Sequence, residues 1–321
     1  MKVRFSRNGN LFGNTSLYIM KSRFGNPRAL IATATYNERD NVDPLLQSIF
    51  KLGGEFEALV IDDASPDGTG VHLKHLAATE PRLHVVRRPS KLGLGSAHQL
   101  AFQYAIRRGF DRLVTMDADL SHDPADIPRL LDALEGADMV IGSRYVKGGG
   151  SDYQGYRKFL SISANTLAHY LLRIPLHEFT TSFRAFDVGM LRRHRRANPR
   201  STGYSFFMET VFRLHGAGFR IAEVPIYFKD RSEGESKLPK FEIVRGVATL
   251  FRLAASKAIR HKSFESAAEV NGKCPRCASP YLIETFPADS RGRPSKEHKR
   301  NHLVIQCLEC GERSMPRSDG S

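Results

Sequence analysis

The sequence predicts an α/β protein: a mainly parallel sheet flanked by helices, followed by a small C-terminal module. Short apolar runs alternate with amphipathic segments between residues 29 and 143. Such continuous runs are typical of strands covered on both faces by helices. All four cysteines fall near the C-terminus, outside this alternation. The chain therefore divides into a large α/β domain and a separate short module.

The overall composition is that of a globular protein with an anionic partner. The chain has 321 residues, 41% of them hydrophobic, and a formal net charge of +14. A strongly basic balance favours nucleic acid, a phosphorylated ligand or a membrane surface as partner. Residues 1–26 lack the apolar core of a signal peptide, and no uncharged apolar run reaches the roughly 20 residues of a membrane span. We therefore expect a cytoplasmic protein.

Each element of the α/β domain can be assigned from its pattern. Strands are predicted where apolar residues run together, at 29–34, 58–61, 83–86, 113–116 and 139–142. Helices are predicted where apolar residues recur at helical spacing, at 42–52, 70–79, 95–108, 127–134, 157–173 and 241–261. Gly53 and Gly109 end two of these helices.

Polar groups follow all five predicted strands. They are Tyr36-Asn37-Glu38, Asp62-Asp63, Arg87-Arg88, Asp117 with Asp119, and Arg144. Ligands of open α/β sheets bind outside the carboxyl ends of the strands, so these residues predict a nucleotide or phosphate site. A glycine-rich dinucleotide fingerprint after the first strand and a Walker loop are both absent from the sequence.

Asp117 and Asp119 are the strongest candidates for chemistry. They end a buried strand at positions i and i+2, where carboxylates can hold Mg²⁺ or Mn²⁺ against a diphosphate. For an isolated Asp-x-Asp, a helix cap and turn would be the simpler interpretation. The polar residues at the other strand ends favour the metal site.

With these motifs in order over residues 28–240, the sequence resembles family 2 glycosyltransferases of GT-A fold, and more narrowly the polyprenol-phosphate (dolichol-phosphate) mannosyltransferases. The matching segments are Thr35–Glu38, Val60–Thr69, Lys91–Ala97, Met116–His122, Ile141–Tyr145, Arg157 with Ser161 and Ala164-Asn165, Thr181–Phe186, Gly203–Phe206 with Glu209, and Arg231 with Ser236-Lys237.

The resemblance implies a role for each matching position. The donor nucleotide would contact Thr35, Tyr36, Asn37, Glu38, Asp62, Asp63, Lys91, Gly93, Gly95 and Ala118. Catalysis would depend on Asp117 and Asp119, which hold the metal and diphosphate, and on Arg144, Arg231 and Lys237, which contact phosphates. The acceptor phosphate would lie near Arg157, Ser161, Arg184 and Glu209. The reaction implied is a metal-dependent, inverting single displacement.

Three positions depart from the family pattern. Ser121 stands where the family often has Gln, and Glu178 and Ser182 stand where it usually has Asp and Gly.

GDP-mannose is the favoured donor and a polyprenyl or dolichyl phosphate the favoured acceptor. UDP-glucose with the same acceptor, or a glycan acceptor, is the alternative. A non-catalytic zinc-ribbon binding protein is an alternative of another class.

The helices at 157–173 and 241–261 carry apolar residues flanked by basic ones. Either could pack on the domain or lie in a membrane interface. Family members often continue into transmembrane helices, which are not found in this sequence. We therefore expect peripheral binding at the cytoplasmic face of a membrane, directly or through a membrane-protein partner.

The cysteines form two Cys-x-x-Cys knuckles, the first of Cys274 and Cys277 and the second of Cys307 and Cys310. Four thiolates in this spacing predict a structural Zn²⁺ site in a zinc ribbon, with strands at 281–286 and 303–306. The basic residues of this module have no aromatic residues between them, which favours protein contacts over nucleic acid. The predicted organisation is an extension (1–26), a GT-A domain (27–240), an amphipathic helix with linker (241–272) and the zinc ribbon (273–315).

Overall fold

Strands and helices alternate from Ala29 onward in the computed structural model. The structure describes residues 27–53, 56–193, 199, 201, 203, 205–230, 240–258, 286–288, 302–306 and 313–314. Its main strands are β1 (Ala29–Thr35), β2 (Phe56–Asp62), β3 (Leu83–Arg87), β4 (Arg112–Asp117), β5 (Met139–Ser143), β7 (Arg184–Asp187) and β8 (Ile221–Pro225). Its helices are α1 (Val42–Lys51), α2 (Thr69–Ala77), α3 (Leu94–Arg108), α4 (Ile127–Ala133), α5 (Gly155–Leu172), α6 (Val188–Arg193), α7 (Ser205–Gly216) and α8 (Lys240–Ala258), with a 3-10 turn at Pro124–Asp126.

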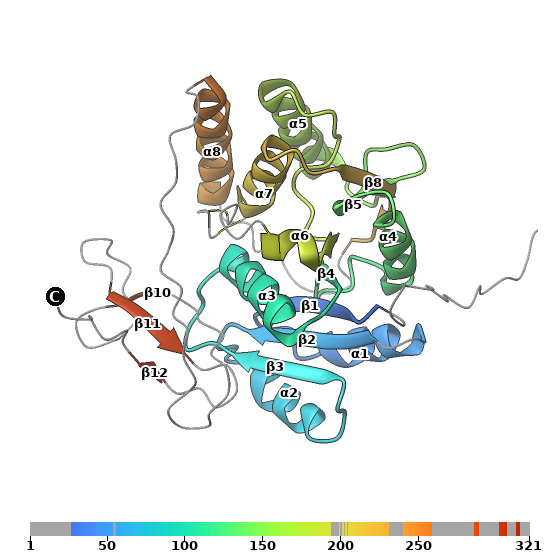
Figure 1. Ribbon diagram of the computed structural model, residues 1–321, viewed down its shortest axis with the longest axis vertical. Coiled ribbons are helices and arrows are strands. Elements are labelled where there is room, and N and C mark those ends of the chain that lie inside the picture. The colour runs from blue at the N-terminus through green and yellow to red at the C-terminus, as the bar shows by residue number, and fades with distance from the viewer. Residues whose placement is uncertain are drawn as a thin grey trace, which may run out of the picture.

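The seven main strands form one sheet in the order β3-β2-β1-β4-β7-β5-β8 (Figure 1). β1 pairs in parallel with β2 and β4, and β5 pairs in parallel with β8. β7 is antiparallel to both of its neighbours, β4 and β5. The predicted mainly parallel sheet is thus confirmed, whereas β7 and β8 are not among the strands that the sequence predicts.

Helices cover both faces of the sheet because side chains alternate along each strand. On one face, Leu30 and Ala32 pack against α3, α6 and α7. On the other face, Ile31 packs in a cluster with residues of α1 and α4. A third cluster joins α1 and α2 to β2 and β3.

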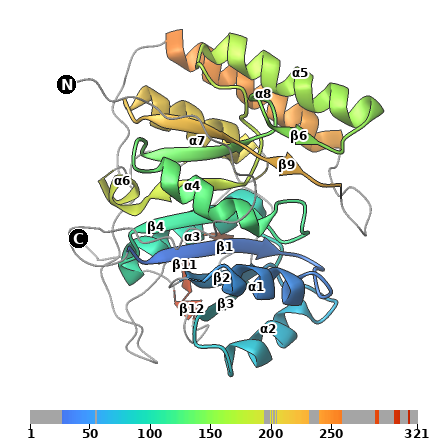
Figure 2. The ribbon, with the colours of Figure 1, turned by 90° about the vertical axis from the view of Figure 1, so that its right-hand side faces the viewer.

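α5 and α8 form an outer layer beyond α7. α8 packs against both α5 and α7, and Figure 2 shows α5 and α8 side by side. Within the described part of the chain, no helix is long and apolar enough to cross a membrane.

Two small sheets complete the fold. β6 (Gly150–Ser151) pairs in parallel with β9 (Tyr227–Phe228) beside the main sheet. Near the C-terminus, β11 (His302–Gln306) pairs antiparallel with β10 (Phe286–Ala288) and β12 (Arg313–Ser314). The second strand predicted for the ribbon agrees with β11. β10 begins where the first predicted strand ends, and β12 is additional.

The predicted zinc site is not tested by this structure. Its four predicted ligands, Cys274, Cys277, Cys307 and Cys310, lie outside the described residues, as do residues 1–26. Because no cysteine is described, the three short strands near the C-terminus do not by themselves establish a zinc ribbon. The zinc ribbon and its Zn²⁺ ion therefore stay a prediction from the cysteine spacing.

Candidate active site

The predicted site residues meet where the parallel strands end. The sheet register pairs Thr35 at the end of β1 with Asp62 of β2. On the other side of β1, Ala34 pairs with Asp117 of β4. The carboxylates of two strands thus flank one central strand, as the sequence pattern predicted.

Asp62 is held inside the protein by neighbouring groups. Its side chain is fully buried and accepts a hydrogen bond from the Thr35 hydroxyl at 3.2 Å and another from the Ser65 hydroxyl. A Cβ atom at Gly70 would clash with Asp62 Oδ2, so glycine is the residue that fits there. Asp62 therefore fixes the turn after β2.

The loop after β1 is tied to that turn. The Asn37 backbone N–H donates to Ser65 Oγ at 3.0 Å, and the Glu38 N–H donates to Thr69 Oγ1 at 3.2 Å. Asn37 has a φ of 59°, a left-handed conformation that Asn tolerates better than most residues. The Glu38 carboxylate accepts from Asn41 Nδ2 at 2.7 Å. The backbone of the Tyr36–Glu38 loop is thereby set in place.

The Lys91–Gly95 loop is clamped by a buried ion pair between Asp63 and Arg88. The Gly93 N–H donates to Asp63 Oδ2 at 3.3 Å, and Arg88 Nη2 donates to the Gly93 carbonyl at 3.1 Å. Burial raises the pKa of Asp63, although Arg88 opposes that rise. The loop brings Lys91 Nζ to 3.8 Å from the centre of the Tyr36 ring. The Lys91 cation and the Tyr36 ring therefore lie together beside the carboxyl ends of the strands.

Asp117 and Asp119 stand at the end of β4, on either side of the buried Ala118. The Asp117 side chain is 29% exposed, and Asp119 is 6% exposed as a residue. Asp119 Oδ1 accepts the Ser121 N–H at 3.1 Å, which closes a turn through Leu120 at a φ of 62°. The turn directs the chain away from the sheet immediately after the two carboxylates.

This donor set fits a magnesium or manganese ion. Hard divalent cations of this size bind one or two carboxylates and take further oxygens from water or a substrate phosphate. Among the described residues there is no group of three or more potential metal-binding side chains, so this part of the chain supplies no complete cage. Two carboxylates at a strand end are therefore suited to a cation that is shared with a diphosphate.

His122 was not predicted as a site residue, yet it contacts Asp117 directly. Its Nδ1 accepts the Asp117 backbone N–H at 3.2 Å, and its Nε2 lies 3.2 Å from Thr181 Oγ1. The ring packs against Phe183 and Phe228, and burial lowers its pKa. His122 therefore supports Asp117 as a neutral ring. The sequence signal that could have identified it is its position three residues after Asp119.

Arg144 leaves β5 and forms a buried, bidentate ion pair with Glu178. Nε donates to Oε2 at 2.7 Å and Nη2 donates to Oε1 at 2.9 Å. Tyr145, Tyr153 and Phe228 surround the guanidinium. Burial alone would lower the pKa of Arg144, but Glu178 raises it above the usual range. The Arg144 guanidinium therefore stays charged, and Glu178 fixes its orientation.

Two of the four predicted acceptor residues lie at the start of α5. Arg157 is exposed there, 3.6 Å from Asp230. Ser161 lies one helical turn later, and its Oγ is 2.6 Å from the hydroxyl of Tyr145. Tyr145 directly follows Arg144 in the sequence. The two remaining phosphate-binding candidates, Arg231 and Lys237, lie outside the described residues.

The other two acceptor assignments do not fit the structure. Arg184 is 1% exposed, and its guanidinium donates to the carbonyls of Thr181, Phe179 and Phe207. Glu209 is fully buried and pairs with Arg213 at 2.7 Å. Both side chains face the interior, where an acceptor phosphate cannot reach them. We correct their role to structural support of β7 and α7.

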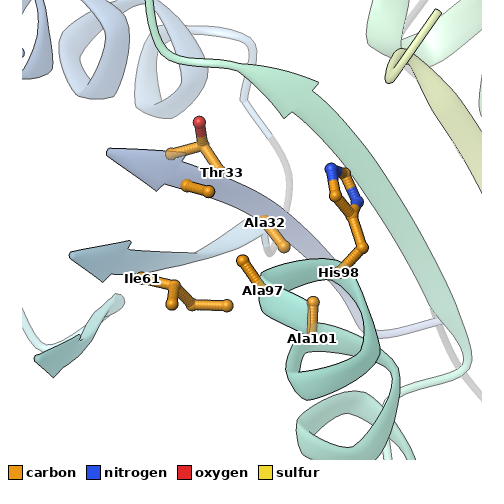
Figure 3. Close-up of a pocket in the computed structure, with 7 residues that line it drawn as sticks. Ala32, Thr33, Ile61, Ala97, His98 and Ala101 are labelled. Carbon is orange, nitrogen blue, oxygen red and sulfur yellow. The ribbon is translucent and has the colours of Figure 1, made fainter. Parts of the chain in front are cut away.

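A small cavity lies behind the strand ends, between α3 and the sheet (Figure 3). Its volume is about 10 Å³, and Ala32, Ile61, Ala97 and His98 are among its lining residues. That is room for about one water molecule. His98 Nε2 makes no hydrogen bond within the described part of the chain. The cavity is too small for a nucleotide sugar.

The chain matches a known family model and named relatives. Residues 30–195 match a family model described as glycosyl transferase family 2. Polyprenol monophosphomannose synthase of Mycolicibacterium smegmatis is 42% identical over 214 residues, covering 66% of this chain and 81% of the relative. Undecaprenyl-phosphate mannosyltransferase of Micrococcus luteus is 41% identical over 212 residues, covering 66% of this chain and 87% of the relative.

The fold also matches solved structures. Glucosyl-3-phosphoglycerate synthase of Mycobacterium tuberculosis, solved with Mn²⁺, UDP-glucose and phosphoglyceric acid, gives a TM-score of 0.53 at 19% identity. The match covers 71% of this chain and 80% of that chain. At this identity the likeness shows a shared fold.

Proposed function

This chain belongs to glycosyl transferase family 2, and we propose that it transfers mannose from GDP-mannose to a polyprenyl phosphate. The observation that carries this is the 42% identity, over 214 residues, to a relative named polyprenol monophosphomannose synthase. The aligned length includes 81% of that relative, so the likeness is not confined to one motif. Family membership identifies a glycosyltransferase rather than a non-catalytic binding protein.

The nucleoside of the donor is assigned to the edge formed by the loops after β1 and β3. Tyr36, Asn37 and Glu38 lie on a loop fixed by Ser65 and Thr69. Lys91 lies over the Tyr36 ring and adds a positive charge near the donor phosphates. Asp62 and Asp63 support these loops from inside, because their carboxylates already accept bonds from protein groups.

The diphosphate is assigned to Asp117 and Asp119, which would hold a Mg²⁺ or Mn²⁺ ion. When bound, the cation would neutralise part of the charge that develops on the leaving diphosphate. The carboxylates are suited to this because Ser182 and Ser121 orient them by hydrogen bonds of 2.7 and 3.1 Å. Preorganised groups of this kind lower the cost of reorganisation during reaction.

The acceptor phosphate needs positioning more than activation. A phosphate monoester is anionic at neutral pH, so its oxygen can attack the sugar C1 without a general base. A new C1–O bond forms as the C1–diphosphate bond breaks on the opposite face, which inverts the anomeric centre. Arg144, Arg157, Arg231 and Lys237 are proposed to hold the two anions close despite their repulsion.

We propose that α5 and α8 bring the enzyme to a membrane surface that contains the lipid. Tyr156, Phe159 and Tyr170 of α5 are each more than two thirds exposed, at 73%, 68% and 71%. Val247 and Phe251 on the neighbouring α8 are also exposed. Apolar groups at these positions would insert among headgroups. Binding through a membrane-protein partner is the alternative.

Basic residues lie beside this apolar face. Arg157 and Lys158 on α5, and Arg245 and Arg252 on α8, are all exposed. Each basic residue near an anionic bilayer contributes about 1 kcal/mol. An anionic membrane surface is therefore the favoured partner, with the polyprenyl chain in the bilayer and its phosphate directed to Arg157.

A structural Zn²⁺ ion bound by Cys274, Cys277, Cys307 and Cys310 remains a separate proposal, which rests on the spacing of the cysteines alone. The transfer reaction does not depend on it. Release of one equivalent of zinc on denaturation of the purified protein would support this proposal, and zinc-free protein with full thermal stability would contradict it.

A donor panel tests the function. Purified protein would be mixed with Mg²⁺ or Mn²⁺, polyprenyl phosphate in detergent, and radiolabelled GDP-mannose or UDP-glucose. We expect label to pass into the organic phase from GDP-mannose. Transfer from UDP-glucose alone would change the sugar but keep the lipid acceptor. Metal-dependent nucleotide binding without lipid labelling would place the acceptor elsewhere, for example on a glycan.

A further inference from the structure

Ser182, on the segment that leads into β7, lies opposite Asp117 at the end of the neighbouring strand β4. The antiparallel register of β4 and β7 pairs Thr115 with Arg184. Continuing the register by two residues places Ser182 opposite Asp117, where side chains on one face are near neighbours. Thr115 Oγ1 donates to the Ser182 carbonyl at 2.6 Å, which fixes the backbone there. Ser182 is 3% exposed, so its hydroxyl has little freedom to turn elsewhere.

The Ser182 hydroxyl donates to Asp117 Oδ1 at 2.7 Å. The backbone of Asp117 is held separately, because its N–H donates to His122 Nδ1 at 3.2 Å. His122 is in turn held by Thr181, the neighbour of Ser182, at 3.2 Å. The segment leading into β7 therefore fixes both the main chain and one carboxylate oxygen of Asp117.

We propose that Ser182 is a positioning residue for Asp117: its hydroxyl fixes the orientation of the carboxylate that holds the divalent cation. This inference rests on the metal site of the proposed function. Hydrogen bonds to a ligating carboxylate orient the ligand, and removing them typically weakens metal binding about 10- to 100-fold.

The test is Mn²⁺ binding to the protein with GDP, followed by electron paramagnetic resonance of free Mn²⁺. We expect Ser182→Ala and Ser182→Gly to weaken Mn²⁺ binding about 10-fold. Ser182→Thr keeps the hydroxyl and should bind within about threefold of the wild type. In activity assays, Ser182→Ala should need more Mn²⁺ for half-maximal rate and recover kcat when Mn²⁺ is saturating.

Thermal unfolding of the same variants separates positioning from packing. A merely structural Ser182 would lower Tm in Ser182→Ala and leave the Mn²⁺ affinity of the folded protein unchanged, and that result would overturn the inference. Equal losses of affinity in Ser182→Ala and Ser182→Thr would also overturn it, because the hydroxyl would not be the cause.

Asp117→Asn in the same titration distinguishes this inference from the proposed function. If Asp117→Asn binds Mn²⁺ as tightly as the wild type, the metal site itself is wrong and the inference falls with it. If Asp117→Asn loses binding while Ser182→Ala does not, only the role of Ser182 is wrong. Loss in both, with recovery in Ser182→Thr, is the expected result.

Discussion

Arg144 and Glu178 form two parallel hydrogen bonds, of 2.7 and 2.9 Å, at the end of β5. Glu178 also accepts the backbone N–H groups of Thr180 and Thr181. One carboxylate therefore links β5 to the segment that carries Ser182. The pair fixes the direction of the Arg144 cation and holds the segment on which the orientation of Asp117 depends.

Glu178→Gln should destabilise the protein by about 3–5 kcal/mol, because it leaves Arg144 buried without its counter-charge. Urea unfolding measures this loss. Glu178→Asp keeps the charge and should lose less. Arg220→Gln is the matched control: its side chain is 70% exposed, and its pair with Asp138, at 3.8 Å, should contribute at most about 1 kcal/mol. Equal losses in Glu178→Gln and Arg220→Gln would contradict the assignment.

Arg184 should matter for stability and not for acceptor binding. Arg184→Met leaves three buried carbonyls without their guanidinium donor and should cost about 3 kcal/mol or more. Arg157→Met, at an exposed position, should raise the KM for polyprenyl phosphate and leave unfolding unchanged. Steady-state kinetics and urea unfolding of both variants check this contrast. A raised acceptor KM in a stable Arg184→Lys would restore the role first predicted for Arg184.

His98 should make the protein less stable in mild acid. Burial lowers its pKa from 6.5 to about 3, so below pH 6.5 the unfolded chain takes up a proton that the folded chain does not. Stability is therefore lost as the pH falls from about 6.5 toward 3, at up to about 1.4 kcal/mol per pH unit. The His98→Leu substitution removes this dependence.

Urea unfolding of wild type and His98→Leu at pH 7 and pH 5 measures the effect. Between the two pH values, the His98→Leu variant should gain about 2 kcal/mol of stability relative to the wild type. An equal loss of stability in both proteins over this pH range would show that His98 is not the group responsible.

The exposed face of α5 should bind anionic vesicles. Combining Tyr156→Ser with Phe159→Ser should weaken binding to phosphatidylglycerol-containing vesicles at least about 10-fold, since each ring loses apolar burial. Sedimentation with vesicles measures the bound fraction. Val71→Ser removes another exposed apolar residue, on α2, which covers the other end of the sheet, and should bind normally (Figure 2). Normal binding by the double variant would favour a membrane-protein partner.

The sequence predicted the parallel half of the sheet and the residues at its strand ends, because apolar runs followed by polar groups are local patterns. It did not predict β7, a strand of four residues that begins with an arginine. That strand decides which distant side chains meet Asp117, so the contact of Ser182 could not be read from spacing. Arg184 was misassigned for the same reason, since a buried guanidinium and a phosphate-binding one look alike in sequence.

The central claim is that Asp117 and Asp119 hold the cation and diphosphate for transfer of mannose to a lipid phosphate. The most direct measurement is transfer of labelled mannose from GDP-mannose to polyprenyl phosphate by wild type and Asp119→Ala, with Asp132→Ala, exposed on α4, as control. We predict that Asp119→Ala lowers the rate about 100-fold or more while remaining folded, and that Asp132→Ala stays near the wild-type rate. Near-full transfer by a folded Asp119→Ala would contradict the account.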